Sequence, residues 1–310
     1  MIFNIDRLYE SVKKNGHVCV GLDTHIDYIP PAERNKAKND AQAVLAFNLA
    51  LVDATFDAAA CYKVQIAYYE EMGIEGLKTY CETVKYIRNK GGIVIGDIKR
   101  GDIADTAVRY VNAHFSGDFE ADFVTISPYM GMDSVEPWIN YAKKTGKGAF
   151  VLMRTSNKGM KDFQWLTVNS EQSAISNEQL AMSNKRVYHC VGDKLSLLAQ
   201  ENRGSCGYGL FGAVIGCTER DEAAEIRKNY PDLFFLIPGY GAQGGGAIDA
   251  ALLLRDGNGG VVNASRSIIT AWKTENNEQS AITNDFAAGA ARNAAIIMRD
   301  EILGELRDKN

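Results

Sequence analysis

The chain has 310 residues, 46% of them hydrophobic and 24% charged, which is typical of a soluble globular protein with one large domain or two smaller ones. Its formal net charge of −5 leaves no basic excess to neutralise phosphates and excludes a general nucleic-acid binder. No apolar run approaches the roughly 18 residues of a membrane span, and the N-terminus lacks a signal peptide's apolar core.

Cysteine and histidine usage predicts a cytoplasmic protein without a metal site. None of the six cysteines forms a CxxC pair, and several lie in apolar runs, so we expect them to be reduced and buried. The four histidines show neither HxH nor HExxH spacing, and therefore no zinc site is expected.

An amphipathic helix is expected at the N-terminus, and eight strand-like segments follow, most of them separated by helical patterns. The strands are expected at 17–24, 60–67, from 92 onward, 122–128, 148–155, 210–217, 233–239 and 260–267. The helices between and after them are expected at 33–58, 70–89, 103–115, 134–144, 186–202, 219–229 (with Thr218 as its N-cap), 247–255 and 284–307.

The strands are continuous apolar runs, which indicates a parallel sheet covered on both faces. Eight such units favour an α/β fold of the closed (β/α)8 TIM-barrel type, as a single domain over 1–310. An open doubly wound sheet is the alternative. Residues 156–184 are rich in Asn, Ser, Gln and Lys and are expected to form a long loop or insertion. An Ala-rich helical segment at 284–307 ends the pattern.

Charged residues collect where the predicted strands end, which is where barrel enzymes place their sites. Asp97 and Lys99 are two residues apart, so a regular strand would present them on one face, and Asp102 follows in a loop. The other candidate polar residues at strand ends are Asp23, Lys63, Ser127, Arg154 with Ser156, Gln243 and Arg266. The competing interpretations are a surface ion pair for Asp97 and Lys99, a cap for Asp23 and a structural ion pair for Lys63.

A phosphate site is expected near the seventh and eighth strands. The glycine-rich stretch 239–246 would let backbone N–H groups approach an anion, and the next helix would add its positive N-terminus. Gln243 would donate from its amide, and Arg266 would offer a planar fork to phosphate oxygens. A flexible turn is the alternative for this loop.

The stretch 97–106, DIKRGDIADT, fits the pattern DxKxxDIxxT and resembles the signature of the orotidine 5′-phosphate decarboxylase family, most closely its longer bacterial subgroup. The resemblance continues along the chain in GLD at 21–23, KVQIAYYE at 63–70, SPYMG at 127–131, RTSN at 154–157, PGYGAQGG at 238–245 and ASRSI at 264–268. It implies conversion of orotidine 5′-monophosphate to uridine 5′-monophosphate and CO2 in pyrimidine biosynthesis, without a metal or organic cofactor.

The resemblance also implies roles for individual residues. Lys99 would stabilise and protonate the carbanion at C6 of the pyrimidine, Asp97 would lie against the substrate carboxylate, and Lys63 would orient Asp97 and a ribose hydroxyl. It implies a homodimer with shared active sites, in which Asp102 and Thr106 act in the partner's site. The expected substrate contacts are Asp23 to ribose, Ser156 to the pyrimidine, and Gln243 and Arg266 to phosphate.

Two rival functions stay open. Related barrels use DxKxxD with Mg²⁺ in sugar-phosphate chemistry, as decarboxylases or aldolases, but their pattern favours Glu before the first Asp, where this chain has Gly96. A Schiff-base aldolase is disfavoured because flanking carboxylates raise a lysine's pKa. A non-catalytic phosphate-binding barrel would leave the alternating charges without a purpose.

Overall fold

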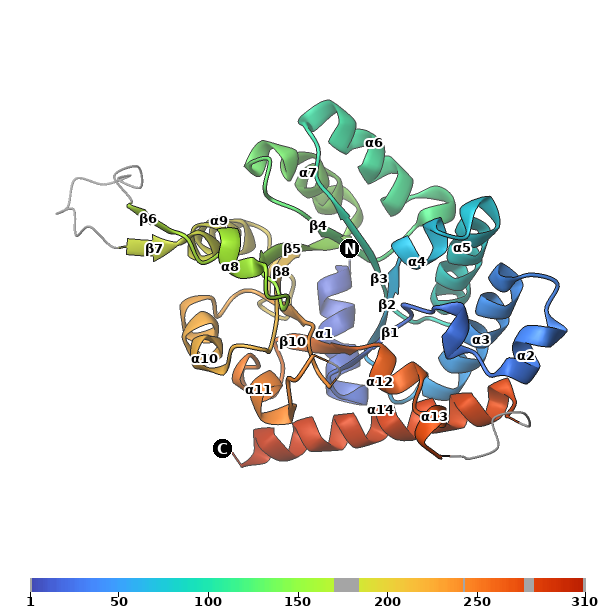
Figure 1. The fold of residues 1–310 in the computed structure, drawn as a ribbon. Helices are drawn as coiled ribbons and strands as arrows, with labels where there is room; N and C mark the ends of the chain where they lie inside the picture. Colours follow the sequence, from blue (N-terminus) through green and yellow to red (C-terminus); the bar gives the residue numbers. More distant parts are fainter. Residues whose placement is uncertain (1, 170–183, 242, 276–281, 309–310) are drawn as a thin grey trace.

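The computed structural model describes residues 2–169, 184–241, 243–275 and 282–308 (Figure 1). Its centre is a closed barrel of eight parallel strands in the order β1-β10-β9-β8-β5-β4-β3-β2. β1 pairs with both β2 and β10, which closes the barrel and confirms the predicted TIM-barrel fold. The barrel strands are β1 (Val18–Gly21), β2 (Cys61–Gln65), β3 (Val94–Arg100), β4 (Phe123–Ile126), β5 (Gly148–Arg154), β8 (Phe211–Ile215), β9 (Phe235–Ile237) and β10 (Gly260–Ala264).

Helices surround the barrel and bury its outer face (Figure 1). The longer ones are α1 (Asn4–Asn15), α3 (Asp40–Thr55), α5 (Gly73–Asn89), α6 (Ala104–Phe115), α7 (Glu136–Thr145), α9 (Val187–Glu201), α10 (Arg220–Asn229) and α14 (Asn284–Arg307). The short ones are α2 (Pro31–Lys36), α4 (Ala67–Glu70), α8 (Met160–Phe163), α11 (Ala247–Leu252), α12 (Arg266–Ile269) and α13 (Trp272–Glu275). None of the helices in these described ranges is long and apolar enough to cross a membrane.

One predicted helix is broken, one begins later than expected, and one predicted cap is wrong. The helix expected at 33–58 is split into α2 and α3, because the Asn39 side chain accepts the Gln42 N–H at 2.9 Å and starts a new helix. The helix expected at 70–89 is α5, which begins at Gly73, where φ is +66°, after the short α4. α10 begins at Arg220 after Glu219, and the Thr218 hydroxyl instead faces the Ser156 carbonyl at 3.5 Å.

Helix α1 closes the barrel at the N-terminal ends of the strands. Its Asn4 bonds the backbone just before β4, and Ser11 and Asn15 donate to the carbonyls of Ala60 and Ala59 before β2. The opposite end, where the strands finish, is therefore the open end of the barrel.

The segment expected to be an irregular loop at 156–184 contains regular elements where it is described. α8 is followed by β6 (Thr167–Asn169), which pairs antiparallel with β7 (Asn184–Arg186). Figure 1 shows this pair projecting away from the barrel beside α8 and α9. The prediction for residues 170–183 lies outside the described residues.

Candidate active site

A buried carboxylate, Asp97 of β3, forms the centre of a hydrogen-bond network at the open end of the barrel. Its Oδ1 accepts from Lys99 Nζ at 2.6 Å and from Thr125 Oγ1 of β4 at 2.8 Å. Its Oδ2 accepts from Lys63 Nζ and from Gln65 Nε2, both at 2.9 Å and both from β2. Four donors therefore fix the position of one carboxylate.

Lys63 links Asp97 to Asp23 of the β1 loop. Its ammonium lies 2.8 Å from Asp23 Oδ1 and 2.9 Å from Asp97 Oδ2, while the residue is only 5% exposed. Burial alone would lower the pKa of Lys63, but the two carboxylates outweigh burial and raise it above its ordinary value. Burial would likewise raise the pKa of Asp97, yet the ammonium groups of Lys63 and Lys99 hold it well below its usual range.

The charges of Asp23, Lys63, Asp97 and Lys99 thus alternate along one connected row. The Lys99 side chain is 47% exposed, so its ammonium is the member of the row that is open to a ligand. The surface-ion-pair alternative for Asp97 and Lys99 is wrong, because Asp97 is 5% exposed.

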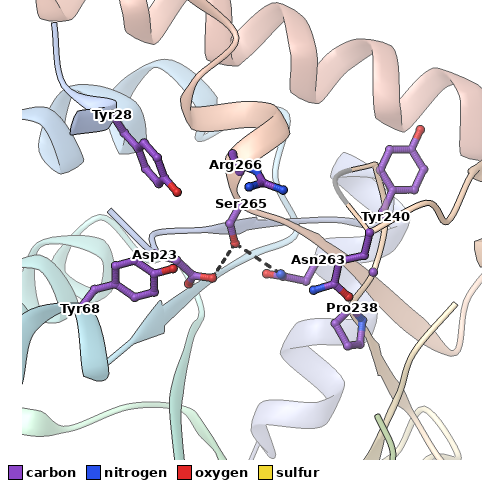
Figure 2. A pocket seen from close by; sticks show the side chains of 10 residues that line it. Asp23, Tyr28, Tyr68, Pro238, Tyr240, Asn263, Ser265 and Arg266 are labelled. Atoms are coloured by element: carbon purple, nitrogen blue, oxygen red, sulfur yellow. Dashed lines mark hydrogen bonds between the residues drawn. The ribbon is translucent and has the colours of Figure 1, made fainter. Parts of the chain in front are cut away.

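The other side of Asp23 is held by the last barrel strand (Figure 2). Ser265 Oγ donates to Asp23 Oδ2 at 2.9 Å, and Asn263 Nδ2 lies 3.5 Å from the same hydroxyl. Tyr28 and Tyr68 face this group from the opposite wall, and Arg266 lies above it. The alternative role of Asp23 as a helix cap or turn residue is not what the structure shows.

Two adjoining hollows occupy the open end of the barrel and share Asp23, Pro238, Gln243 and Asn263. The larger, about 500 Å³, is lined by the charged row together with Thr125, Ser156 and Gln164. The smaller, about 260 Å³, is lined by Gly239, Tyr240, Ser265 and Arg266. An elongated ligand could therefore span from Lys99 to Arg266, with its charged ends in different hollows.

The glycine-rich loop pairs several of its own N–H groups. The N–H groups of Gly241, Gly244 and Gly245 donate to carbonyls within the loop, and the Gly246 N–H donates to Asp249. The six-residue helix α11 follows the loop. Gln243 and Arg266 both line the smaller hollow, and their binding of phosphate stays a prediction.

Asp102, Ser127 and Arg154 of the predicted strand-end set line neither of the two hollows, and Thr106 is likewise absent from them. Asp102 lies beyond β3, where its Oδ1 accepts the N–H of Ile103 at 2.8 Å. Arg154 is fully buried, and its Nε lies 3.7 Å from Glu222 of α10. Within the described part of one chain, Lys99 pairs with Asp97 and not with Asp102.

Sequence reasoning missed several neutral side chains of this site. Gln65 follows Lys63 by two residues on one strand, so period-two geometry could have found it. Thr125 is uncharged and lies within an apolar strand, so nothing in the sequence distinguished it from a core residue. Gln164 accepts the Thr155 N–H at 2.9 Å from within the insertion, and no sequence signal marked it.

Comparisons with known proteins find related sequences and structures over nearly the whole chain. Residues 16–280 match the model of the orotidine 5′-phosphate decarboxylase / HUMPS family. An orotidine 5′-phosphate decarboxylase of Clostridium tetani is 50% identical over 305 residues, covering 98% of this chain and 99% of the relative. One from Clostridium botulinum strain Loch Maree is 54% identical over 274 residues, covering 88% and 92%. The solved OMP decarboxylase of Leishmania donovani is 30% identical, with a TM-score of 0.74 over 99% and 100% of the two chains.

Proposed function

The chain belongs to the orotidine 5′-phosphate decarboxylase / HUMPS family, and from this we infer that it decarboxylates orotidine 5′-monophosphate to uridine 5′-monophosphate, a step of pyrimidine biosynthesis. The observation that carries the mechanism is the row of alternating charges, which ends in the accessible ammonium of Lys99. The full-length relatives bear the decarboxylase name, which favours this reaction over the metal-dependent sugar-phosphate chemistry of the same family.

Lys99 stabilises the reaction's developing charge. Loss of CO2 leaves an electron pair on C6 of the pyrimidine, where little delocalisation is available. An ammonium held beside that carbon stabilises the negative charge as it forms. The same ammonium then donates a proton to C6, which gives the product and a neutral lysine that solvent reprotonates. No metal or organic cofactor takes part in this proposal.

Asp97 and Lys63 supply the electrostatic frame. Four hydrogen bonds hold the Asp97 carboxylate in place, so it cannot turn away when the substrate carboxylate is bound close to it. The repulsion between the two carboxylates is relieved when CO2 leaves, a contribution we rank below stabilisation by Lys99. Lys63 keeps Asp97 ionised and orients Asp23 toward the ribose hydroxyls.

Groups remote from C6 bind the rest of the nucleotide. Ser156 contacts the pyrimidine in the larger hollow, and Gln243 and Arg266 bind the phosphate in the smaller one. Binding energy from the phosphate can orient the base against Lys99, because it is gained far from the reacting carbon.

The protein acts as a homodimer in this proposal, with Asp102 and Thr106 completing the partner's site. Two observations support it. Asp102 stands outside the cavity of its own chain. Exposed apolar side chains lie on its loop, on α6 and on the neighbouring loop after β4: Ile103 at 58%, Val108 at 41%, Tyr129 at 85% and Met130 at 48% exposure. We also place the enzyme in the cytoplasm, a location with which its six free cysteines are consistent.

The decisive experiment follows the loss of orotidylate absorbance with EDTA present. We expect wild-type turnover to be unaffected by the chelator and Lys99→Ala to lose roughly 10³-fold or more in kcat. Lys144→Ala, which removes an exposed lysine of α7, is the control and should keep full activity. Full activity in Lys99→Ala would overturn the mechanism, and loss of turnover on chelation would restore the metal-dependent alternative.

A further inference from the structure

The carboxyl end of β3 departs from regular sheet geometry at the catalytic lysine. Gly96 pairs with Val124 and Arg100 with Ile126, so four steps along β3 match two steps along β4. Within this irregularity Lys99 has φ +46°, one of two non-glycine residues with positive φ in the described chain. A left-handed conformation is unfavourable for lysine and persists only where neighbours impose it.

At this irregularity the backbone N–H of Lys99 bonds a side chain of β4, the Thr125 hydroxyl. Thr125 is 1% exposed, and its Oγ1 accepts the Lys99 backbone N–H at 3.0 Å. The same oxygen donates its hydrogen to Asp97 Oδ1 at 2.8 Å. A hydroxyl has a single hydrogen, so the bond to the carboxylate directs a lone pair toward the N–H.

One side chain therefore joins the main chain of Lys99 to the carboxylate that holds the Lys99 ammonium. Asp97 Oδ1 receives both the Thr125 hydroxyl and Lys99 Nζ, so the three groups form a closed ring of contacts. The ring fixes both ends of the lysine side chain, its backbone and its ammonium.

We propose that Thr125 is a positioning residue for decarboxylation, which sets the backbone conformation of Lys99 and the orientation of Asp97 so that the ammonium faces C6. The assignment rests on the proposed function. The Thr125 hydroxyl acts through Lys99 and Asp97, with which it makes its two hydrogen bonds. Thr125 bonds Lys99 and Asp97, whereas the residues proposed to bind ribose and phosphate lie on other strands. We therefore expect its loss to slow the chemical step more than it weakens substrate binding.

The test compares Thr125→Val with Thr125→Ser. Valine keeps the β-branched shape and volume but lacks the hydroxyl, so kcat should fall about 10- to 100-fold, the effect of losing a hydrogen bond to a charged group. KM should change less than threefold, roughly, since binding of ribose and phosphate is untouched. Serine keeps the hydroxyl and should recover most of kcat.

Thr79→Val is the matched control, since Thr79 is a buried threonine of α5 whose hydroxyl donates to the Ala41 carbonyl at 2.9 Å. It should lower the melting temperature and leave kcat unchanged. If Thr125→Val does not fold, Thr125→Ala and Thr125→Ser are compared at a temperature at which both are folded.

The outcomes separate the two proposals. A wild-type enzyme that turns over orotidylate, with Thr125→Val at full kcat or with its whole loss in KM, overturns the role of Thr125 and leaves the proposed function standing. An equal loss in Thr125→Val and Thr125→Ser also overturns it. A wild-type protein without turnover overturns the proposed function, and the assignment of Thr125 falls with it.

Discussion

Lys63 shows how a buried charge can be tolerated when its partners are in place. It is 5% exposed and contacts the carboxylates of Asp23 and Asp97, the second of which is also paired with Lys99. Removing one partner of a buried ion pair lowers the free energy of unfolding more than replacing both partners with apolar residues, because it leaves an uncompensated buried charge.

We expect Lys63→Met to lower the free energy of unfolding by about 3–5 kcal/mol. Adding Asp97→Asn should recover part of this loss, because one of the two carboxylates that lose the Lys63 ammonium is then neutral. Urea unfolding followed by circular dichroism measures both variants, with Lys144→Met as the control. A loss below about 1 kcal/mol in the single variant would contradict the buried pairing.

The pH dependence of this network has a definite sign. The lowered pKa of Asp97 contributes stability that is present above about pH 4, the ordinary value for aspartate, and is lost as the pH falls. The raised pKa of Lys63 contributes stability that is present below about pH 10.5 and is lost as the pH rises further. The difference between wild type and Lys63→Met should therefore be largest between these two limits.

His17, just before β1, gives a second pH prediction. Burial lowers its pKa to about 4, against a bond to the Gly257 carbonyl at 3.1 Å that favours the charged form. Between about pH 6.5 and pH 4 the imidazole is protonated in the unfolded chain but neutral in the folded chain. The free energy of unfolding therefore falls as the pH is lowered through that range. His114 behaves alike, because burial, aided by Arg100, lowers its pKa to about 4 as well.

When the pH is lowered from 7 to 4, we expect the free energy of unfolding to fall by about 3 kcal/mol less in His17→Gln than in wild type. Urea midpoints at several pH values measure this difference, and His25→Gln, at a partly exposed position, is the control. Parallel profiles for wild type and His17→Gln would show that His17 is not buried in its neutral form.

At the scale of elements, Asn48 of α3 joins three parts of the barrel wall. Its Oδ1 accepts from Thr24 at 2.7 Å, and its Nδ2 donates to Tyr69 at 2.8 Å and Thr83 at 3.3 Å. The Tyr69 hydroxyl continues to the Leu22 carbonyl at 3.1 Å. Asp23 stands between Leu22 and Thr24, so this buried network supports the loop that carries it.

We expect Asn48→Ala to destabilise the protein by about 3 kcal/mol, because several buried polar groups lose their partner. KM for orotidylate should also rise, since Asp23 is less firmly placed. Thermal unfolding and steady-state kinetics measure the two effects. Asn89→Ala at the exposed end of α5 should change neither, and an unchanged melting temperature in Asn48→Ala would refute the network's importance.

The elements also show what a sequence can and cannot predict. The strands were predictable because parallel strands buried on both faces are continuous apolar runs. The break before α3 was not, because it depends on the bond between the Asn39 side chain and the Gln42 N–H, which no hydrophobic pattern marks. The pairing of β6 with β7 lies in polar sequence with no alternation to identify it.

The candidate site divides in the same way. Lys63, Asp97 and Lys99 were predictable because charge at a strand's end is costly without a use. Thr125 was missed because a hydroxyl in an apolar strand looks like packing, and its role depends on a bulge that no pattern marks. The internal bonds of the glycine loop were not predictable, because a count of glycines does not reveal which of their N–H groups bond within the loop.

At the scale of the whole molecule, the shared site can be tested by subunit mixing. Lys99→Ala and Asp102→Ala homodimers should each be nearly inactive. In a mixed dimer, one site contains the intact Lys99 of one subunit and the intact Asp102 of the other. Equal mixing should therefore restore about a quarter of wild-type activity, since half the dimers are mixed and half their sites are complete.

Mixing Lys99→Ala with Asp97→Ala is the control for this experiment. Both residues serve the site of their own chain, so no mixed site is complete and no activity should return. Failure of the first mixture to recover activity, with subunit exchange verified by size and mass, would mean that Asp102 does not act across the interface.

The bond between Ser265 and Asp23 has a consequence for synthesis of the protein. It joins residues 242 positions apart, across the seam where β1 meets β10. While a ribosome is still making the chain, β1 has no partner on that side and Asp23 lacks its second support. The nucleotide-binding end is thus completed only when residue 265 has emerged from the exit tunnel, and shorter nascent chains expose an open sheet edge to chaperones.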